Sequence, residues 1–515
     1  MKHLPIALLA ALLMPAAGLL AACPLPDGRQ ATFANPVISA DVADPTIIRW
    51  GDVYYAAGTS SEWAPHYPLY RSTDLVNWQQ TGHIFDRLPE WTSSSFWAPE
   101  LFVHDGKVFC YYTARSRATG RSYVGVATAA HPEGPYEDHG PLVDFGTEDI
   151  DAFVFDDGGQ RYISWKAYGL DPRPIELLCQ PLSSDGLHLE GEAVTLLTDE
   201  EGIGIEGQCM FRQGDWYYLL YAARGCCGRG SDYEVRVARS PIACGPYTPY
   251  EDNPILMRSN DFQSCGHGTL VDTPDHRLFY LCHAYLRGDG FFRGRQPILQ
   301  QLVVGSDGWP HFLTGRLATI CQPMPFEGTV QQPCNAFDDD FASETLRVEW
   351  TWNYPYCDVQ TSLSKGDLLL SGTPKTDHGG AALCLRPWTT DYVFETQLAG
   401  KNSAFTGITF YGNPKAYVAL GRQGSTLRLL CVQGDDERVL AEIPHLKGDL
   451  YLRGTVSHGS QLAFAYSRDG SQWTDIAIDA FDGTSVMSWD RISRPGLFTE
   501  ADSRHPARFA RFTMR

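Results

Sequence analysis

The sequence has little positive charge, and past its first twenty residues no apolar run is long enough to cross a bilayer. Its 41 Lys and Arg residues are outnumbered by 61 Asp and Glu residues, so the formal net charge is −20. Nucleic acids and anionic membrane surfaces both need a basic footprint, and this balance argues against either as a partner. Pairs of Cys-x-x-Cys motifs are also missing, which argues against a zinc site built from cysteine. A neutral partner such as a polysaccharide fits the charge better.

Long amphipathic helical periodicity is absent as well. Short alternating or wholly apolar runs lie between Gly, Asp, Asn and Pro residues along the whole chain, which predicts an all-β protein. The length of 515 residues predicts two or three domains. Aromatic residues make up 12% of the chain. Flat rings stack on sugars and are common in sugar-processing enzymes, although a β-rich core accounts for most of them.

The N-terminus carries a targeting segment. An apolar stretch at residues 4–20 follows Lys2 and ends in small residues just before Cys23, which predicts a signal peptide over residues 1–22. The end of this segment, Leu-Ala-Ala-Cys, is similar to the bacterial lipobox, in which Cys23 would be lipidated. Ordinary cleavage after Ala22 is the alternative. Either way we expect an exported protein, periplasmic or at the cell surface, with a lipid anchor as its only membrane contact, or secreted if no anchor is added.

A repeat organises residues 30–320. A glycine or polar turn followed by a short aromatic strand occurs five times, at residues 51–55, 106–110, 159–163, 214–218 and 276–280. The spacing is about one propeller blade, and each copy is followed by a further strand and a polar turn. Four strands per unit and five units predict a five-bladed β-propeller.

The repeat ends near residue 320. Pro323, Pro325, Gly328 and Pro333 indicate a linker, after which strands of period two appear, for example at residues 392–398. Residues 335–515 are therefore expected to form a β-sandwich of jelly-roll or lectin type.

Five unusual segments stand at one phase of the repeat, about a dozen residues before each recurring strand. They contain Asp44, Trp97, Asp151, Glu206 and His267. Equivalent positions in a propeller lie at equivalent radii, so these side chains should converge from the innermost strands on the central axis. A single Asp before Pro is usually a turn residue, but three carboxylates at one phase are harder to explain as turns.

Glycoside hydrolysis needs these groups. One carboxylic acid protonates the leaving oxygen and one carboxylate acts on the other face of the sugar, and inverting enzymes leave room for a water between the pair. A third carboxylate beside the acid raises the pKa of that acid by like-charge repulsion.

In this order and spacing the segments resemble glycoside hydrolase family 43 over residues 35–313. The resemblance implies that Asp44, in Ala43-Asp44-Pro45, is the general base and that Glu206, in Ile205-Glu206-Gly207, is the general acid. It implies that Asp151 modulates the pKa of the acid and orients it. The family inverts the anomeric centre, so one water would attack directly and no cofactor would be required.

The same resemblance assigns substrate-binding roles to Trp97, Arg295, His267 and Trp63. Trp97 would line the sugar pocket, and Arg295 would contact sugar hydroxyls. In some relatives the matching His lies beside a bound ion or water, so a structural calcium beside His267 is one interpretation. The alternatives are a core Trp, a surface Arg and a buried, hydrogen-bonded His. Trp63 belongs to a Ser-Ser-Glu-Trp stretch similar to one in family β-xylosidases.

Three departures from the family pattern leave the sugar open. Gln208 stands where relatives often have Pro, Cys265 where Gly or Pro is common, and Ser61 where a Phe walls the β-xylosidase pocket. The adjacent Cys226 and Cys227 resemble a double-Cys loop of arabinose-acting members, and they form either a vicinal disulfide or two thiols.

The C-terminal segment resembles the concanavalin-like sandwich appended to family β-xylosidases, where it can close one side of the pocket. We therefore expect an exo-acting β-xylosidase or α-L-arabinofuranosidase that releases terminal pentose from plant polysaccharide or its oligosaccharides. An endo-arabinanase with an open groove is one alternative. A non-catalytic glycan-binding protein of the cell surface is the other, although it would gain nothing from three converging acids.

Overall fold

The structure is a computed structural model that describes residues 31–168, 174–333, 336–376, 379–399, 402–478, 481–487 and 492–515. The predicted signal peptide and Cys23 lie outside these residues. Within them the chain is nearly all β-strand, and the helical elements are two short 3-10 helices, η1 (Gly288–Arg293) and η2 (Gly483–Val486). A search of the same residues finds no helix with the length and hydropathy to cross a membrane. The all-β prediction is confirmed.

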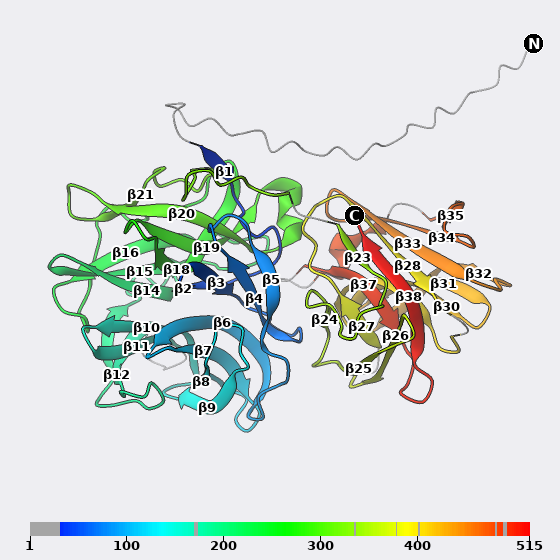
Figure 1. Ribbon diagram of the computed structural model, residues 1–515, viewed down its shortest axis with the longest axis horizontal. Coiled ribbons are helices and arrows are strands. Elements are labelled where there is room, and N and C mark those ends of the chain that lie inside the picture. Colours follow the sequence, from blue (N-terminus) through cyan, green and yellow to red (C-terminus); the bar gives the residue numbers. More distant parts are fainter. Residues whose placement is uncertain are drawn as a thin grey trace, which may run out of the picture.

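Five four-stranded blades form the N-terminal part (Figure 1). Blade one contains β2 (Thr46–Trp50), β3 (Val53–Ala57), β4 (His66–Ser72) and β5 (Gln79–Phe85), and blade two contains β6 (Thr92–His104), β7 (Lys107–Ser116), β8 (Ser122–Ala129) and β9 (Glu137–Val143). Blade three contains β10 (Glu148–Asp157), β11 (Gln160–Tyr168), β12 (Glu176–Leu182) and β13 (Val194–Thr198). Blade four contains β14 (Ile205–Gln213), β15 (Trp216–Ala223), β16 (Glu234–Ser240) and β17 (Thr248–Pro249), and blade five contains β18 (Phe262–Asp272), β19 (Leu278–Leu286), β20 (Gln296–Val304) and β21 (Pro310–Phe312).

The blades close into a ring through their first strands. Each of β2, β6, β10 and β14 contacts the first strand of the next blade, and β18 contacts β2. The repeated aromatic segments fall on the second strand of each blade, where they fill the core between neighbouring blades. The short strands β1 (Thr32–Ala34) and β22 (Cys321–Pro323) pair with each other and join the two ends of this region. The predicted five-bladed propeller is confirmed.

The C-terminal part is a two-sheet sandwich around one large apolar core (Figure 1). One sheet contains β25 (Cys357–Ser364), β26 (Asp367–Pro374), β38 (Ala507–Met514), β28 (Tyr392–Leu398), β33 (Leu450–Ser457), β34 (Gln461–Ser467) and β35 (Trp473–Asp475), with β23 (Phe337–Asp339) and β36 (Phe481–Asp482) at its sides. The other contains β24 (Thr351–Trp352), β27 (Ala381–Cys384), β37 (Arg494–Thr499), β29 (Thr406–Asn413), β30 (Ala416–Gln423), β31 (Thr426–Gln433) and β32 (Asp436–Ile443).

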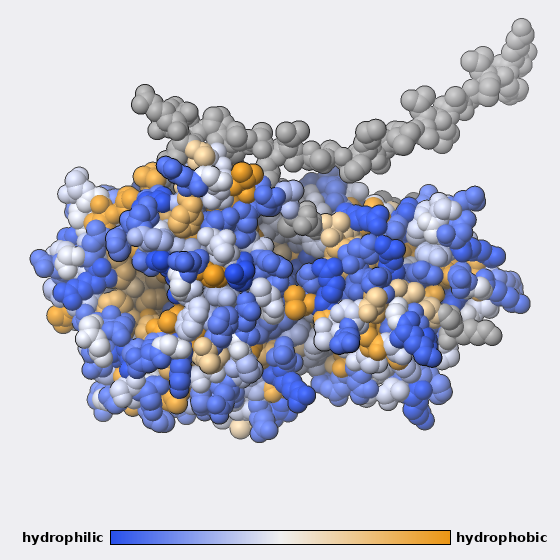
Figure 2. Space-filling view, in the orientation of Figure 1, coloured by the Kyte–Doolittle hydropathy of each residue, from blue (hydrophilic) through white to orange (hydrophobic). Residues whose placement is uncertain are grey.

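The sandwich packs directly on blade one through Trp63. This side chain is buried in an apolar cluster that otherwise consists of sandwich residues. Its ring lies 6.0 Å from the ring of Tyr411 and 4.3 Å from the guanidinium of Arg494. Next to it, Ala64 forms a β-bridge with Trp352. The two domains therefore share a small hydrophobic core beside the first blade, while hydrophilic residues predominate over the face of both domains seen in Figure 2.

Candidate active site

One backbone feature recurs on the inner edge of every blade. At or just before the first strand, each blade has a residue with a positive φ: 51° at Asp44, 42° at Ala98, 59° at Asp151, 57° at Gly207 and 48° at His267. Residues other than glycine seldom adopt this left-handed conformation. In blades two to five the strand pairing is interrupted at these residues, as in a β-bulge. Bulges re-aim side chains, and here they turn them from the blade toward the centre of the ring.

The five predicted positions are therefore not all equivalent. Asp44, Asp151 and His267 are the left-handed residues of their blades, whereas Trp97 and Glu206 each stand one residue before theirs. In blade four the left-handed residue is Gly207, and a Cβ on it would meet the His267 ring at 2.6 Å. Glycine is required there because of both the backbone conformation and this contact.

Asp44 is held as an anion by cationic and polar groups. Arg295 Nη1 donates to its Oδ1 at 3.1 Å, and the Thr59 hydroxyl donates to its Oδ2 at 2.6 Å. His283 Nδ1 lies 3.2 Å and His267 Nδ1 3.6 Å from the same Oδ1. Burial alone would raise the pKa of Asp44, but Arg295, His283 and His267 together hold it well below the ordinary value.

Asp151 shares His267 with Asp44 but lacks such a strong cation. Its Oδ2 lies 3.7 Å from His267 Nδ1 and accepts a hydrogen bond from the backbone N–H of Gly207 at 3.2 Å. Burial raises the pKa of Asp151 to about 6, and the nearby Glu206 carboxylate acts in the same direction. Asp151 therefore keeps its proton to a higher pH than Asp44 does.

Glu206 forms a buried ion pair. Lys166 Nζ lies 2.5 Å from its Oε2, and the Tyr233 hydroxyl donates to its Oε1 at 2.7 Å. The side chains of Lys166 and Glu206 are 11% and 17% exposed. The expectation that a neighbouring carboxylate keeps Glu206 protonated does not match these neighbours. Burial raises the pKa of Glu206, but the Lys166 ammonium, the hydrogen bond from Tyr233 and the nearby His267 together outweigh burial, so the pKa lies below the ordinary value.

The other predicted residues occupy different surroundings. Arg295 is only 7% exposed, so the surface alternative is wrong, and it contacts Asp44 directly. Trp97 is partly exposed on β6 beside Ala98. Trp63 lies in the core shared with the sandwich. Cys226 and Cys227 are bonded as a disulfide in the loop before Tyr233.

The calcium hypothesis rests on His267. Calcium takes six to eight oxygen ligands. The described residues contain no group of three or more His, Cys, Asp or Glu side chains placed to hold a metal ion. His267 instead lies between the carboxylates of Asp44 and Asp151. These side chains alone do not complete a calcium ligand set, and the calcium beside His267 stays a prediction.

Comparison with known proteins decides the family. Residues 33–310 match the family described as Glycosyl hydrolases family 43. The chain belongs to glycosyl hydrolase family 43. Residues 338–513 of this family 43 protein match the Beta xylosidase C-terminal Concanavalin A-like domain. The resemblance in the sequence is thereby confirmed for both domains.

Curated relatives and solved structures agree with this family. A non-reducing end alpha-L-arabinofuranosidase of Bacteroides ovatus is 30% identical, over 67% of this chain and 66% of that protein. A xylan 1,3-beta-xylosidase from a Vibrio species is 26% identical, over 86% of this chain and 90% of that protein. The crystal structure of a xylan beta-1,4-xylosidase from Bacillus halodurans superposes with a TM-score of 0.81 at 22% identity, over 94% of this chain and 100% of that one, and shares its fold.

Sequence reasoning missed several residues of this family 43 site. Lys166 and Tyr233 contact Glu206, and His283 and Thr59 contact Asp44. Lys166 did leave a signal, because it is a charged residue within the otherwise apolar end of β11. The others look like ordinary strand and loop residues, and only the closed ring brings them to the carboxylates.

Proposed function

We propose that this chain is an inverting, exo-acting glycoside hydrolase that removes a terminal β-D-xylose or α-L-arabinofuranose from plant polysaccharide or its oligosaccharides. Asp44 is the general base, Glu206 the general acid, and Asp151 the group that orients the acid and modulates its pKa. The observation that carries the proposal is the convergence of these three carboxyls from three blades, each with different charged neighbours.

Asp44 is suited to the base. A base must be ionised to take a proton from the attacking water, and Arg295 stabilises the ionised form of Asp44 through a hydrogen bond of 3.1 Å. The hydrogen bond from Thr59 fixes the second carboxylate oxygen. One oxygen thus faces Arg295 and the two histidines, and the orientation of the carboxylate is determined before substrate binds.

Glu206 can become an acid when substrate binds. A glycosidic oxygen that displaces Lys166 Nζ from Glu206 Oε2 would remove the charge that lowers the pKa of Glu206. Burial would then favour the protonated carboxyl, as catalysis by an acid requires. Asp151 lies in the same cluster and disfavours a second negative charge there. Tyr233 stays on the opposite oxygen and keeps the carboxyl in place.

The position of the sandwich supports exo action. Trp63 lies in blade one, in the segment between β3 and β4. The sandwich covers the side chain of Trp63. The Ser61–Phe96 bridge links this segment to the strand that carries Trp97. A wall on this side of the ring favours a pocket that accepts chain ends over a groove open at both sides.

The first experiment compares p-nitrophenyl β-D-xyloside, p-nitrophenyl α-L-arabinofuranoside and debranched arabinan as substrates. Release of monosaccharide from either small substrate is expected, and the ratio identifies the preferred pentose. Proton NMR of the first product formed should show the anomer opposite to that of the substrate. Oligosaccharides from arabinan alone would point to endo action. Retention of the anomeric configuration would contradict a single displacement by water.

The cellular location is part of the same proposal. The basis is the segment at residues 1–22 and the Leu-Ala-Ala-Cys sequence that ends at Cys23. A lipid on Cys23 would keep the protein in the membrane fraction of a bacterial host. Cys23→Ala should move it to the soluble exported fraction, and an unchanged distribution would contradict lipidation.

A further inference from the structure

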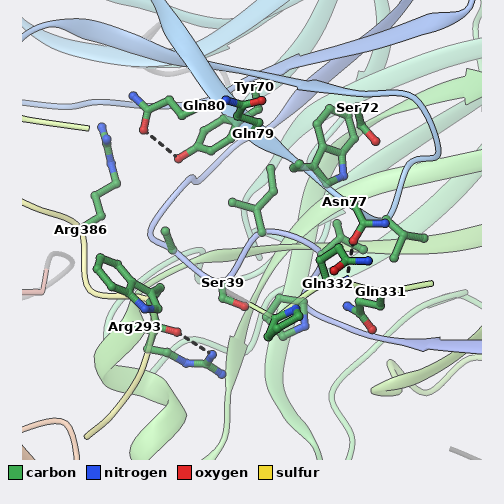
Figure 3. Close-up of a pocket in the computed structure, with 18 of the residues that line it drawn as sticks. Ser39, Tyr70, Ser72, Asn77, Gln79, Gln80, Arg293, Gln331, Gln332 and Arg386 are labelled. Carbon is green, nitrogen blue, oxygen red and sulfur yellow. Dashed lines mark hydrogen bonds between the residues drawn. The ribbon is translucent and has the colours of Figure 1, made fainter. Parts of the chain in front are cut away.

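A large cavity lies between blade one and the sandwich (Figure 3). Its volume is about 1150 Å³. It is lined by the segment that enters the propeller at residues 34–40, by β4 and β5, and by residues 385, 386 and 388 of the sandwich. Asp44, Asp151 and Glu206 are not among its lining residues, so it is separate from the candidate active site. Ligand pockets commonly measure about 300–1000 Å³, so this cavity has room for several sugar rings.

The lining has the chemistry of a sugar-binding site. Side-chain amides donate and accept hydrogen bonds as sugar hydroxyls do, and indole rings cover the apolar faces of sugars. The lining contains both kinds of group: Asn77, Gln79, Gln80, Gln332, Trp78 and Trp388. The amides of Asn77 and Gln80 and the indole N–H of Trp78 also donate hydrogen bonds within the chain, which fixes their positions around the cavity. Figure 3 shows Arg386 and Arg293 on one side of the cavity and Asn77, Gln331 and Gln332 on the other.

The charge of the lining is opposite to that of the whole protein. Four arginines line the cavity, Arg71, Arg293, Arg347 and Arg386, against a single acid, Glu349. That acid is already paired with Arg347 at 2.7 Å. A chain of net charge −20 has thus gathered a positive surface around this space. Such a surface attracts an anionic ligand.

Arg386 is the most informative of these residues. It is 6% exposed, and its Nε and Nη2 have no hydrogen-bond partner among the described residues. A second arginine, Arg494, is also buried nearby. Burial lowers the pKa of Arg494, and repulsion by the charge of Arg386 lowers it further. Asp41 is 3.9 Å from Arg494 and acts on both arginines. Burying a cation without a partner is costly, and an acceptor in the cavity would remove that cost.

We propose that this cavity binds an acidic oligosaccharide, a short sugar chain that carries a carboxylate such as a uronosyl group. Arg386 pairs with the carboxylate through its remaining nitrogen, Nη1, in a charge-assisted hydrogen bond, because Nε and Nη2 are buried out of reach of the cavity. The amides and indoles hold the neutral rings. The proposal rests on the cavity and its charges, and it stands whether or not Asp44 and Glu206 have the roles proposed above.

The test is isothermal titration calorimetry with two ligands of equal backbone length, xylotetraose and xylotetraose bearing one glucuronosyl branch. The protein is the full chain with Glu206→Gln, and chromatography after each titration checks that the ligand is intact. Cleavage seen there would contradict the role of Glu206 and not the cavity site. Arg386→Met is compared with Arg468→Met, which changes an exposed arginine between β34 and β35. Sodium glucuronate and inorganic phosphate are titrated as separate arms.

The acidic ligand should occupy one more site than the neutral ligand. Arg386→Met should weaken that site at least about tenfold, since a charge-assisted pair is lost, while Arg468→Met leaves it unchanged. Arg386→Met should also raise the melting temperature of the ligand-free protein, whereas a purely structural arginine would lower it. Arg386→Lys keeps the positive charge, and should weaken the site less than Met does.

Three results would overturn the proposal. They are equal stoichiometry for the acidic and neutral ligands, unchanged binding of the acidic ligand to Arg386→Met, and phosphate or free glucuronate binding as tightly as the branched oligosaccharide. The last result would reduce the cavity to a general anion site without recognition of the sugar chain.

Discussion

Replacing Lys166 by Met tests the electrostatics of the site most directly. The substitution keeps most of the volume of the side chain but removes the ammonium that lies 2.5 Å from Glu206 Oε2. Both side chains are less than one-fifth exposed, so solvent screens the pair weakly. Removing one partner of a buried pair costs about 3–5 kcal/mol, because the other charge is left without compensation. We expect Lys166→Met to lose about that much free energy of unfolding at pH 7.

The loss should depend on pH. In the native protein the folded-state pKa of Glu206 is lowered, so Glu206 adds stability above its unfolded-state pKa and loses it as the pH falls. Without Lys166, burial is the largest remaining influence and raises the folded-state pKa of Glu206. Its contribution is then present below the unfolded-state pKa and is lost as the pH rises. The difference between the two proteins should therefore be small near pH 4 and largest at neutral pH.

Urea unfolding followed by tryptophan fluorescence measures this difference, because Trp165 is fully buried beside Lys166 on β11. The matched control is the double variant Lys166→Met with Glu206→Gln. It should be within about 1 kcal/mol of Glu206→Gln alone, since a neutral amide tolerates burial better than an unpaired carboxylate. A single variant as stable as the native protein at pH 7, or an equal loss in the Glu206→Gln background, would refute this account.

Three further predictions concern the site and the domain interface. Asp44→Asn and Glu206→Gln should each lower kcat on p-nitrophenyl pentosides by about a hundredfold to ten-thousandfold, with unchanged circular dichroism, and near-normal turnover in either would show that the assignment is wrong. Arg295→Met should move the acid limb of the pH profile of kcat/KM to higher pH, because Arg295 is the strongest of the charges that lower the pKa of Asp44; a limb that stays in place would show that Asp44 is not the titrating base. Trp63→Ala should lower the free energy of unfolding by about 3–5 kcal/mol and lower the temperature of the thermal transition in calorimetry. An unchanged transition would show that the shared core does not hold the two domains together.

The sequence allowed the propeller and its carboxyls to be predicted because both follow the repeat. The aromatic turn-strand segments recur once per blade, and Asp44, Asp151 and His267 stand at one phase of that recurrence. The left-handed backbone conformation at these positions, however, depends on the tertiary structure. The sequence could not show that Glu206 lies one residue earlier than the left-handed position, and the expectation of equal phase was wrong for it.

The charge state of the acid could not be predicted for a similar reason. Lys166 is 40 residues away from Glu206 in the chain and meets it only because blades three and four are neighbours in the ring. The carboxylates alone predict a raised pKa for Glu206, whereas Lys166 is the main group that lowers it. The one signal in the sequence is that Lys166 is a charged residue near the end of an otherwise apolar strand.

The left-handed residue in each blade also limits which amino acids can serve there. Asp, Asn, Gly and His tolerate a positive φ better than most residues, and longer side chains such as Glu are disfavoured. This is consistent with aspartates at the two left-handed positions that carry a carboxyl, Asp44 and Asp151. The longer acid Glu206 instead stands one residue earlier, and the glycine that follows it, Gly207, takes the left-handed conformation. The backbone conformation of each blade is thus linked to the length of the acidic side chain that it carries, with one methylene group in Asp44 and Asp151 and two in Glu206.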